Sequence, residues 1–230
     1  MKKQEVRAII EKVGIVPVIR ASSAEEARFA AECVCKGGVP IVEITMTVPG
    51  ALDVIRELAK SMPEVLLGAG TVLNEEAARK CADAGAQFLV TPGFNAGTVE
   101  AAQRLDLLIM AGALTPSEIM EASASGADFV KVFPCGSMGG PKYIQALRGP
   151  FPNVPFIPTG GVNLETAAGY IRAGAAALGV GGEMIAKDAL KARDGDALSK
   201  LAALFADLVR DARKAAAQSA RLMAGEGHKK

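Results

Sequence analysis

The stretch LLIMAGALTPSEIMEASASGADFVKVFP, residues 107–134, holds one complete strand–helix–strand unit. It begins with an apolar run at 107–113. The residues Thr115-Pro116-Ser117-Glu118 then form a typical helix start, because threonine can cap, proline fits the first helical position and Glu118 can close a capping box. Gly126 follows the helix and precedes a second apolar run at 129–134. Two such runs joined by a helix predict parallel strands that are buried on both faces.

The same unit recurs along the chain. One helical stretch, 23–36, opens with the capping-box spacing Ser23-Ala24-Glu25-Glu26 and stops at Gly37-Gly38, and Asn74 and Asn163 begin two more. Eight units of this kind close into a (β/α)8 barrel, the TIM-barrel fold. The alternative is an open doubly wound sheet, which is disfavoured because no GxGxxG motif opens the first unit. The eight apolar runs lie at 15–20, 41–46, 66–72, 88–92, 107–113, 129–134, 155–159 and 177–181.

Further helical stretches flank the eight units. Residues 3–12 predict an additional N-terminal helix that would cover the bottom of the barrel, and residues 198–222 predict a long Ala-rich C-terminal helix. No linker or shift in composition divides the chain. We therefore expect a single domain over 1–222 and a disordered tail at 223–230.

Composition excludes several classes of function. With 26 basic and 25 acidic residues the net charge is +1, which argues against a nucleic-acid partner. No signal peptide or 18-residue apolar run occurs, so we expect a soluble cytoplasmic protein without a membrane partner. The single histidine, His228, and the absence of a CxxC pair argue against a zinc site. The four cysteines, Cys33, Cys35, Cys81 and Cys135, are read as reduced, buried thiols.

Lys131 is the most informative residue, because it interrupts an apolar strand. Active sites of (β/α)8 barrels form at the carboxyl ends of the strands. If Val130 and Val132 pack on the helices, alternation turns Lys131 into the barrel. An ammonium group there loses hydration, its pKa falls, and the neutral amine can attack a ketone. A lysine at a strand end that reaches solvent is the alternative.

Glu43 occupies an equivalent position between Val42 and Ile44. A carboxylate that faces the same interior as Lys131 could shuttle protons during carbon–carbon cleavage. A buried ion pair without chemistry is the alternative.

Two further residues lie near the predicted site. Arg20, at the end of the first run, could pair with a carboxylate or cap the barrel rim. Cys135 is interpreted as a packing thiol, because no histidine is available to activate it.

Two glycine pairs follow the last two predicted strands. Gly160-Gly161 lies after the seventh run, and Gly181-Gly182 closes the eighth. Loops at these two places commonly bind phosphate in barrels through backbone N–H groups. Ordinary tight-turn glycines are the alternative reading.

These motifs together resemble the KDPG/KHG aldolase family over about residues 10–190. The family acts on 2-keto-3-deoxy-6-phosphogluconate and 4-hydroxy-2-oxoglutarate, and the resemblance implies a (β/α)8 homotrimer that needs no metal or cofactor. The implied reaction is reversible cleavage of a 2-keto-4-hydroxy acid to pyruvate and an aldehyde, which is glyceraldehyde 3-phosphate for the phosphorylated substrate. The matching stretches are VEITMTVPGA (42–51), GAGTVLN (68–74), FLVTPGF (88–94), FVKVFPCGSMGGPKYIQALRGPFPNV (129–154) and PTGGVN (158–163).

The resemblance also assigns roles to individual residues. It implies that Lys131 forms the Schiff base and that Glu43 is the general acid/base. By the same match, the keto-acid pocket is lined by Thr71, Pro92, Phe133 and Thr159, and the phosphate loops contain Gly160, Gly161 and Gly182.

Two positions depart from the family pattern. Thr47 stands where some members carry an arginine that holds the pyruvate carboxylate, and Arg20 is the candidate substitute. Gly182 stands where the phosphate loop often presents a serine, and Glu183 follows it. A carboxylate there would weaken phosphate binding, so a non-phosphorylated keto acid stays open as the substrate. Two other functions also stay open: a sugar-phosphate isomerase or epimerase that uses Glu43 as base, and a non-catalytic assembly scaffold.

Overall fold

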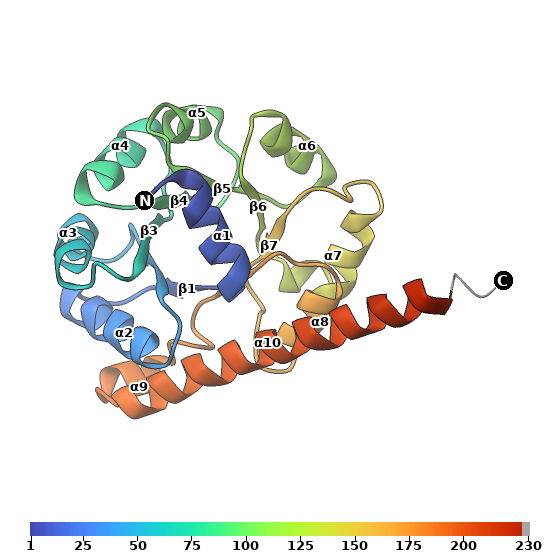
Figure 1. The fold of residues 1–230 in the computed structure, drawn as a ribbon. Helices are drawn as coiled ribbons and strands as arrows, with labels where there is room; N and C mark the ends of the chain where they lie inside the picture. Colours follow the sequence, from blue (N-terminus) through green and yellow to red (C-terminus); the bar gives the residue numbers. More distant parts are fainter. Residues whose placement is uncertain (227–230) are drawn as a thin grey trace.

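The protein folds as eight strands that alternate with helices, as the ribbon in Figure 1 shows. The computed structural model describes the backbone of residues 1–226 and the side chains of residues 1–218. The strands are β1 (Ile15–Ile19), β2 (Ile41–Thr45), β3 (Leu66–Gly70), β4 (Phe88–Val90), β5 (Leu108–Ala113), β6 (Phe129–Val132), β7 (Phe156–Pro158) and β8 (Leu178–Val180). The helices are α1 (Lys3–Val13), α2 (Ala24–Lys36), α3 (Ala51–Ser61), α4 (Glu75–Ala84), α5 (Ala96–Arg104), α6 (Pro116–Ala124), α7 (Pro141–Arg148), α8 (Ala167–Arg172), α9 (Lys187–Lys191) and α10 (Gly195–Glu226), and a 3₁₀ turn, η1 (Gly136–Met138), follows β6.

All strand pairs are parallel, and each strand pairs with its neighbour in sequence from β1 to β7. Strand β8 pairs with β1, and a bridge between Thr159 and Gly179 connects the end of β7 to β8. The sheet therefore closes on itself. The predicted (β/α)8 barrel is confirmed, and the open doubly wound sheet is wrong because its first and last strands would not meet.

The strands bury both faces, as their continuous apolar runs predict. One side of the barrel wall packs against the surrounding helices, with residues such as Val42, Ile44, Val130 and Val132. The other side fills the barrel interior, with large residues such as Phe129. Inward and outward side chains alternate along each strand, so the parity of a residue decides whether it reaches the interior.

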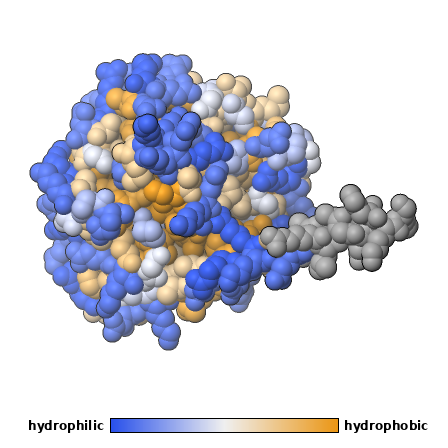
Figure 2. All heavy atoms as spheres, viewed as in Figure 1, coloured by the Kyte–Doolittle hydropathy of each residue, from blue (hydrophilic) through white to orange (hydrophobic). Residues whose placement is uncertain are grey.

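Helix α1 closes the bottom of the barrel, as expected from residues 3–12. Its buried residues Val6 and Ile10 belong to the same interior cluster as Phe129. Lys3 forms an ion pair of 2.9 Å with Asp128 at the start of β6. Figure 1 shows α1 lying across the end of the barrel, and in Figure 2 apolar residues are visible beside its polar outer side.

Outer helices α2, α4 and α6 begin where the polar caps predict, whereas α8 begins at Ala167, four residues after Asn163. Asn163 instead accepts the N–H groups of Glu165 and Thr166 in the turn before that helix, so its prediction as a helix start is wrong. Thr115 and Glu118 form the complete capping box of α6. At α2, Ser23 accepts the Glu26 N–H, but the Glu26 carboxylate accepts the N–H and hydroxyl of Ser22 in place of the Ser23 N–H. The predicted box there is therefore half correct.

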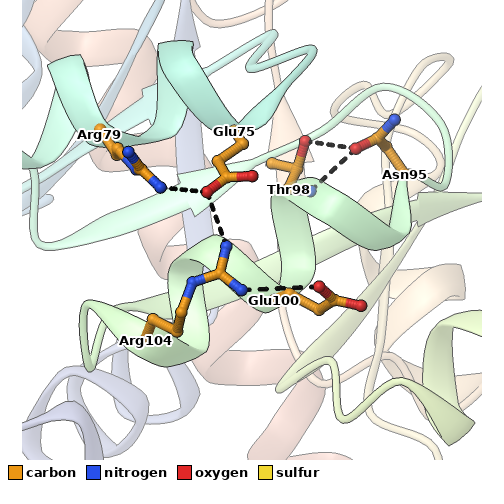
Figure 3. Close-up of polar contacts among 6 residues, drawn as sticks. All are labelled: Glu75, Arg79, Asn95, Thr98, Glu100 and Arg104. Atoms are coloured by element: carbon orange, nitrogen blue, oxygen red, sulfur yellow. Dashed lines mark hydrogen bonds and ion pairs between the residues drawn. The ribbon is translucent and has the colours of Figure 1, made fainter.

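Neighbouring helices are also connected by surface charges, which Figure 3 shows for α4 and α5. Glu75 at the start of α4 pairs with Arg79 of its own helix and, at 2.8 Å, with Arg104 of α5. Asn95 caps α5 by accepting the N–H and hydroxyl of Thr98, both at 2.8 Å. Such exposed pairs contribute little to stability individually.

Helix α10 packs across α2 and α8 on the outside of the barrel. Its buried face carries Leu198, Ala202, Phe205 and Val209 at helical spacing. The helix continues to Glu226, beyond the end at 222 that the sequence predicts, and residues 227–230 of the predicted tail lie outside the described residues. No helix within residues 1–226 is long and apolar enough to cross a membrane.

Candidate active site

Lys131 lies in the middle of β6 and points into the barrel. Its neighbours Val130 and Val132 pack outward, and only 2% of Lys131 is exposed. In the sheet it stands opposite Gly112 of β5 and Ile157 of β7. Its Nζ lies 5.3 Å from the centre of the Phe133 ring. The strand-end lysine that reaches solvent is therefore wrong as a description of this residue.

Glu43 occupies the interior from strand β2. It is 2% exposed, between Val42 and Ile44, which both pack against the outer helices. In the sheet it stands opposite Val18 of β1 and Gly68 of β3. Its buried Oε1 has no hydrogen-bond partner among the described residues. Sequence parity thus predicts correctly that an amine and a carboxyl face the same interior.

Burial favours the neutral form of both groups. Loss of hydration lowers the pKa of the Lys131 amine below its ordinary 10.5, although the charge of Glu43 opposes this change. Loss of hydration also raises the pKa of the Glu43 carboxyl, against the charges of Lys131 and Arg20. A buried pair of this kind keeps an amine that can act as a nucleophile beside a carboxyl that can give or accept a proton.

Glycines at the strand ends leave the room that these side chains fill. A Cβ at Gly70, the last residue of β3, would overlap Oε1 of Glu43 and lie 2.8 Å from its Cγ. At Gly112, opposite Lys131, a Cβ would overlap the backbone of Pro92 and Gly93. Pro92 therefore passes close to the strand position beside the lysine, as a pocket-lining residue would.

Thr71 follows Gly70 in an uncommon backbone conformation. Its φ is 57°, in the left-handed region that non-glycine residues seldom adopt. Backbone strain of this kind is concentrated at functional sites. Thr71 thus directly follows β3 at its carboxyl end, and its predicted role in the keto-acid pocket stays a prediction.

A cavity of about 420 Å³ opens between the ends of β1, β6, β7 and β8. Charged residues at its rim are Arg20, Glu183 and Lys187. Gly160 and Gly161 adopt φ values of 80° and 78°, which suit glycine and expose the backbone of this turn. The predicted site residues that line the cavity are Arg20, Phe133, Thr159, Gly160, Gly161, Gly181 and Gly182.

The other predicted residues lie outside the cavity lining. Lys131 and Glu43 are buried in the barrel interior, and the lysine reaches the cavity wall at Phe133. Thr47 is exposed after β2, and its hydroxyl lies 2.8 Å from the Thr45 hydroxyl. Thr71 and Pro92 are partly buried after β3 and β4. The cavity therefore joins the predicted phosphate loops, whereas Thr47, Thr71 and Pro92 follow the ends of β2, β3 and β4 outside its lining.

Lys187 lines the cavity although its sequence context gives no sign of this role. It lies five residues after Gly182, at the first position of α9. A basic residue shortly after a glycine loop is common, so the sequence alone does not indicate that Lys187 lines the cavity. Its position there follows from the path of the chain between β8 and α9.

The cysteines agree with a packing role. None of the four forms a disulfide, and all but Cys35 are buried. Burial raises the pKa of the Cys135 thiol to about 11, so it is protonated at neutral pH. Among the described residues no group of three His, Cys, Asp or Glu side chains could hold a metal ion.

The fold and the buried amine–carboxyl pair define a barrel enzyme that is suited to amine catalysis on a carbonyl compound. The model of the KDPG and KHG aldolase family matches residues 6–201. The chain belongs to this family.

Relatives and solved structures agree with the family match. The KHG/KDPG aldolase of Escherichia coli strain K12 is 37% identical over 87% of this chain and 94% of its own length. The 2-dehydro-3-deoxy-phosphogluconate aldolase of Dickeya dadantii is 35% identical over the same shares. The crystal structure of the KDPG aldolase of Legionella pneumophila, with pyruvate captured as a covalent carbinolamine intermediate, matches with a TM-score of 0.81 and 30% identity over 86% of this chain and 96% of that one.

Proposed function

We propose that this protein is a class I aldolase in which Lys131 forms a Schiff base with a 2-keto acid. The substrate is a 2-keto-4-hydroxy acid such as 2-keto-3-deoxy-6-phosphogluconate, and the products are pyruvate and glyceraldehyde 3-phosphate. One observation carries the proposal: a lysine with 2% exposure and a lowered pKa shares the barrel interior with a buried carboxyl group. The carbinolamine in the Legionella relative supports the same chemistry.

The reaction follows from the properties of an imine. The neutral Lys131 amine adds to the C2 carbonyl carbon, and loss of water gives a protonated imine. Glu43 gives its proton to the hydroxyl that leaves the carbinolamine as water, and the resulting carboxylate then accepts the proton of the C4 hydroxyl. The C3–C4 bond then breaks, the aldehyde leaves, and the electron pair moves to the imine nitrogen as an enamine. Protonation of the enamine at C3 and hydrolysis of the imine release pyruvate and restore the free amine.

The surrounding residues are assigned by their position. Arg20 is the candidate partner for the substrate carboxylate, because its charge acts on both Glu43 and Lys131. The Phe133 ring lies beside the lysine, and Thr159 closes the barrel between β7 and β8. Thr71 and Pro92 complete the pocket at the ends of β3 and β4. The loops of Gly160, Gly161, Gly181 and Gly182 are the proposed phosphate site.

A coupled assay tests this function directly. Purified protein is mixed with 2-keto-3-deoxy-6-phosphogluconate, and pyruvate release is followed through lactate dehydrogenase and NADH. We expect turnover in wild type and none in Lys131→Ala. An isomerase or epimerase would convert the sugar phosphate without releasing pyruvate, and a scaffold would do neither, so either result would contradict the proposal. The family match and the relatives named above favour neither alternative.

The assembly and location of the protein belong to the same proposal. We propose a homotrimer of single-domain chains in the cytoplasm that acts on a small-molecule keto acid without a metal or cofactor. Family resemblance supports the trimer, and the near-neutral charge supports a protein without a polyanion partner. Light scattering in solution should give three times the mass of one 23.7-kDa chain. The mass of a single chain would contradict the trimer.

A further inference from the structure

Two basic side chains with different surroundings line the cavity between the glycine loops. Arg20 and Lys187 both line it, and both side chains are exposed. The charge of Arg20 acts on the pKa of Glu43 and of Lys131, whereas Lys187 is not among the charges that shift either group. Arg20 directly follows β1, in which Val18 stands opposite Glu43, whereas Lys187 follows the loop after β8 and begins α9.

The Lys187 ammonium group has no ion-pair partner among the residues whose side chains the structure describes. No carboxylate among the described residues lies within 4.0 Å of its ammonium group, whereas many surface lysines and arginines of this protein form such pairs. Glu183, the acidic residue that lines the cavity, likewise forms no ion pair with any described side chain. An unpaired ammonium at the rim of a cavity is free to bind an anionic ligand group.

The glycine loops that line the cavity together with Lys187 can contribute backbone donors. Gly160 and Gly161 both have positive φ, and a Cβ at residue 160 would lie 3.3 Å from the Phe133 ring. A Cβ at Gly182 would meet nothing within 4 Å, so this loop is open to a ligand. Glycine at these positions lets a bulky anion approach the backbone closely.

We propose that Lys187 binds the terminal phosphate ester of the substrate and makes the enzyme selective for phosphorylated keto acids. This inference rests on the proposed aldolase function. Lys187 supplies the ligand contact that a serine at position 182 would otherwise give, and its positive charge offsets the repulsion of Glu183. A terminal phosphate on C6 extends farther from the C2 imine than the terminal carboxylate of 4-hydroxy-2-oxoglutarate. Lys187 lines the cavity with the glycine loops, whereas Lys131 and Glu43 lie outside that lining, so the phosphate is the group assigned to Lys187.

Substitution of Lys187 by methionine tests the proposal, because it removes the charge and keeps most of the side-chain length. The steady-state rate of pyruvate release is measured with three substrates: 2-keto-3-deoxy-6-phosphogluconate, 2-keto-3-deoxygluconate and 4-hydroxy-2-oxoglutarate. Loss of one charge-assisted contact should lower kcat/KM for the phosphorylated substrate by about 10- to 100-fold, mainly through KM. The values for the other two substrates should change by less than about twofold, and Lys187→Arg should retain most of the wild-type preference.

Lys191→Met is the matched control, since this exposed lysine lies on the same short helix outside the cavity lining. It should behave as wild type with all three substrates. An equal loss with all three substrates in Lys187→Met, a selective loss with 4-hydroxy-2-oxoglutarate, or no loss at all would each overturn the phosphate assignment. Pyruvate release by wild type separates this question from the aldolase proposal, because its absence would refute the aldolase and not Lys187 alone.

Discussion

Glu43 lies against the α-carbon of Gly70, in space that any larger residue would occupy. A Cβ at position 70 would overlap the carboxyl oxygen of Glu43. The two residues come from adjacent strands, and the register that sets Thr45 opposite Gly70 brings them together. The missing side chain at residue 70 therefore helps to fix the position of the buried carboxyl.

Gly70→Ala should displace Glu43 and slow catalysis. A shift of about 1 Å at a catalytic group can cost about 10²-fold, so we expect kcat to fall by about that factor. Binding of pyruvate as an imine should persist, because Lys131 is on a different strand. Gly97→Ala in α5 is the control, since a Cβ there meets only Asn95 at the ordinary distance of 3.6 Å. Equal kcat values for Gly70→Ala and wild type would show that the glycine has no role in positioning.

Glu43→Gln should separate imine formation from proton transfer. The amide keeps the size of the side chain and removes its acid–base function, so turnover should fall by about 10²- to 10⁴-fold. Mass spectrometry after borohydride treatment with pyruvate should still detect an adduct. Full turnover by Glu43→Gln, measured in the coupled assay, would rule out the proton-transfer role.

The pH dependence of imine formation follows from the lowered pKa of Lys131. Only the neutral amine attacks the ketone, so the rate should rise with pH through the folded-state pKa and then become constant. Because burial lowers that pKa from 10.5, the plateau should be reached at a lower pH than for a fully hydrated lysine amine. Initial rates of adduct formation with pyruvate, stopped by borohydride at each pH, provide the curve. A curve whose midpoint lies at the ordinary lysine pKa of 10.5 would mean a fully hydrated lysine.

Ile10→Ala should destabilise the barrel without changing its chemistry. Ile10 is fully buried under the barrel bottom, and loss of its side chain should cost about 2–5 kcal/mol of unfolding free energy. Urea unfolding followed by circular dichroism gives the change, and Ile9→Ala, which alters a partly buried neighbour, should cost less. The folded variant should keep the wild-type kcat, because α1 lies at the end of the barrel opposite the site.

The fold could be predicted because each strand is buried on both faces and each helix has a polar start. Strand ends were less predictable. The apolar run at 66–72 continues beyond β3, because Thr71 leaves the strand with a positive φ while Val72 stays fully buried. Phe133 and Pro134 likewise extend the run of β6 without belonging to the strand. Hydrophobicity reports burial, and it does not report which residues keep strand hydrogen bonds.

The part of the site that lies on the strands could be predicted from the alternation of inward and outward side chains. This alternation predicts that Lys131 and Glu43 point into the barrel, and both side chains are buried in its interior. The role of Gly70 depends on the register of β2 and β3, which one sequence does not specify. The position of Lys187 in the cavity lining depends on the turns between β8 and α9, where the sequence has no regular hydrophobic pattern to interpret. Contacts made by loops therefore needed the structure.

Covalent trapping tests the central claim most directly. The protein is incubated with pyruvate and sodium borohydride, digested, and analysed by mass spectrometry. We predict that the peptide with Lys131 gains the mass of a reduced pyruvate imine, and that Lys131→Arg gains none. An unmodified Lys131 peptide in wild type, or an adduct on another lysine, would contradict the Schiff-base account.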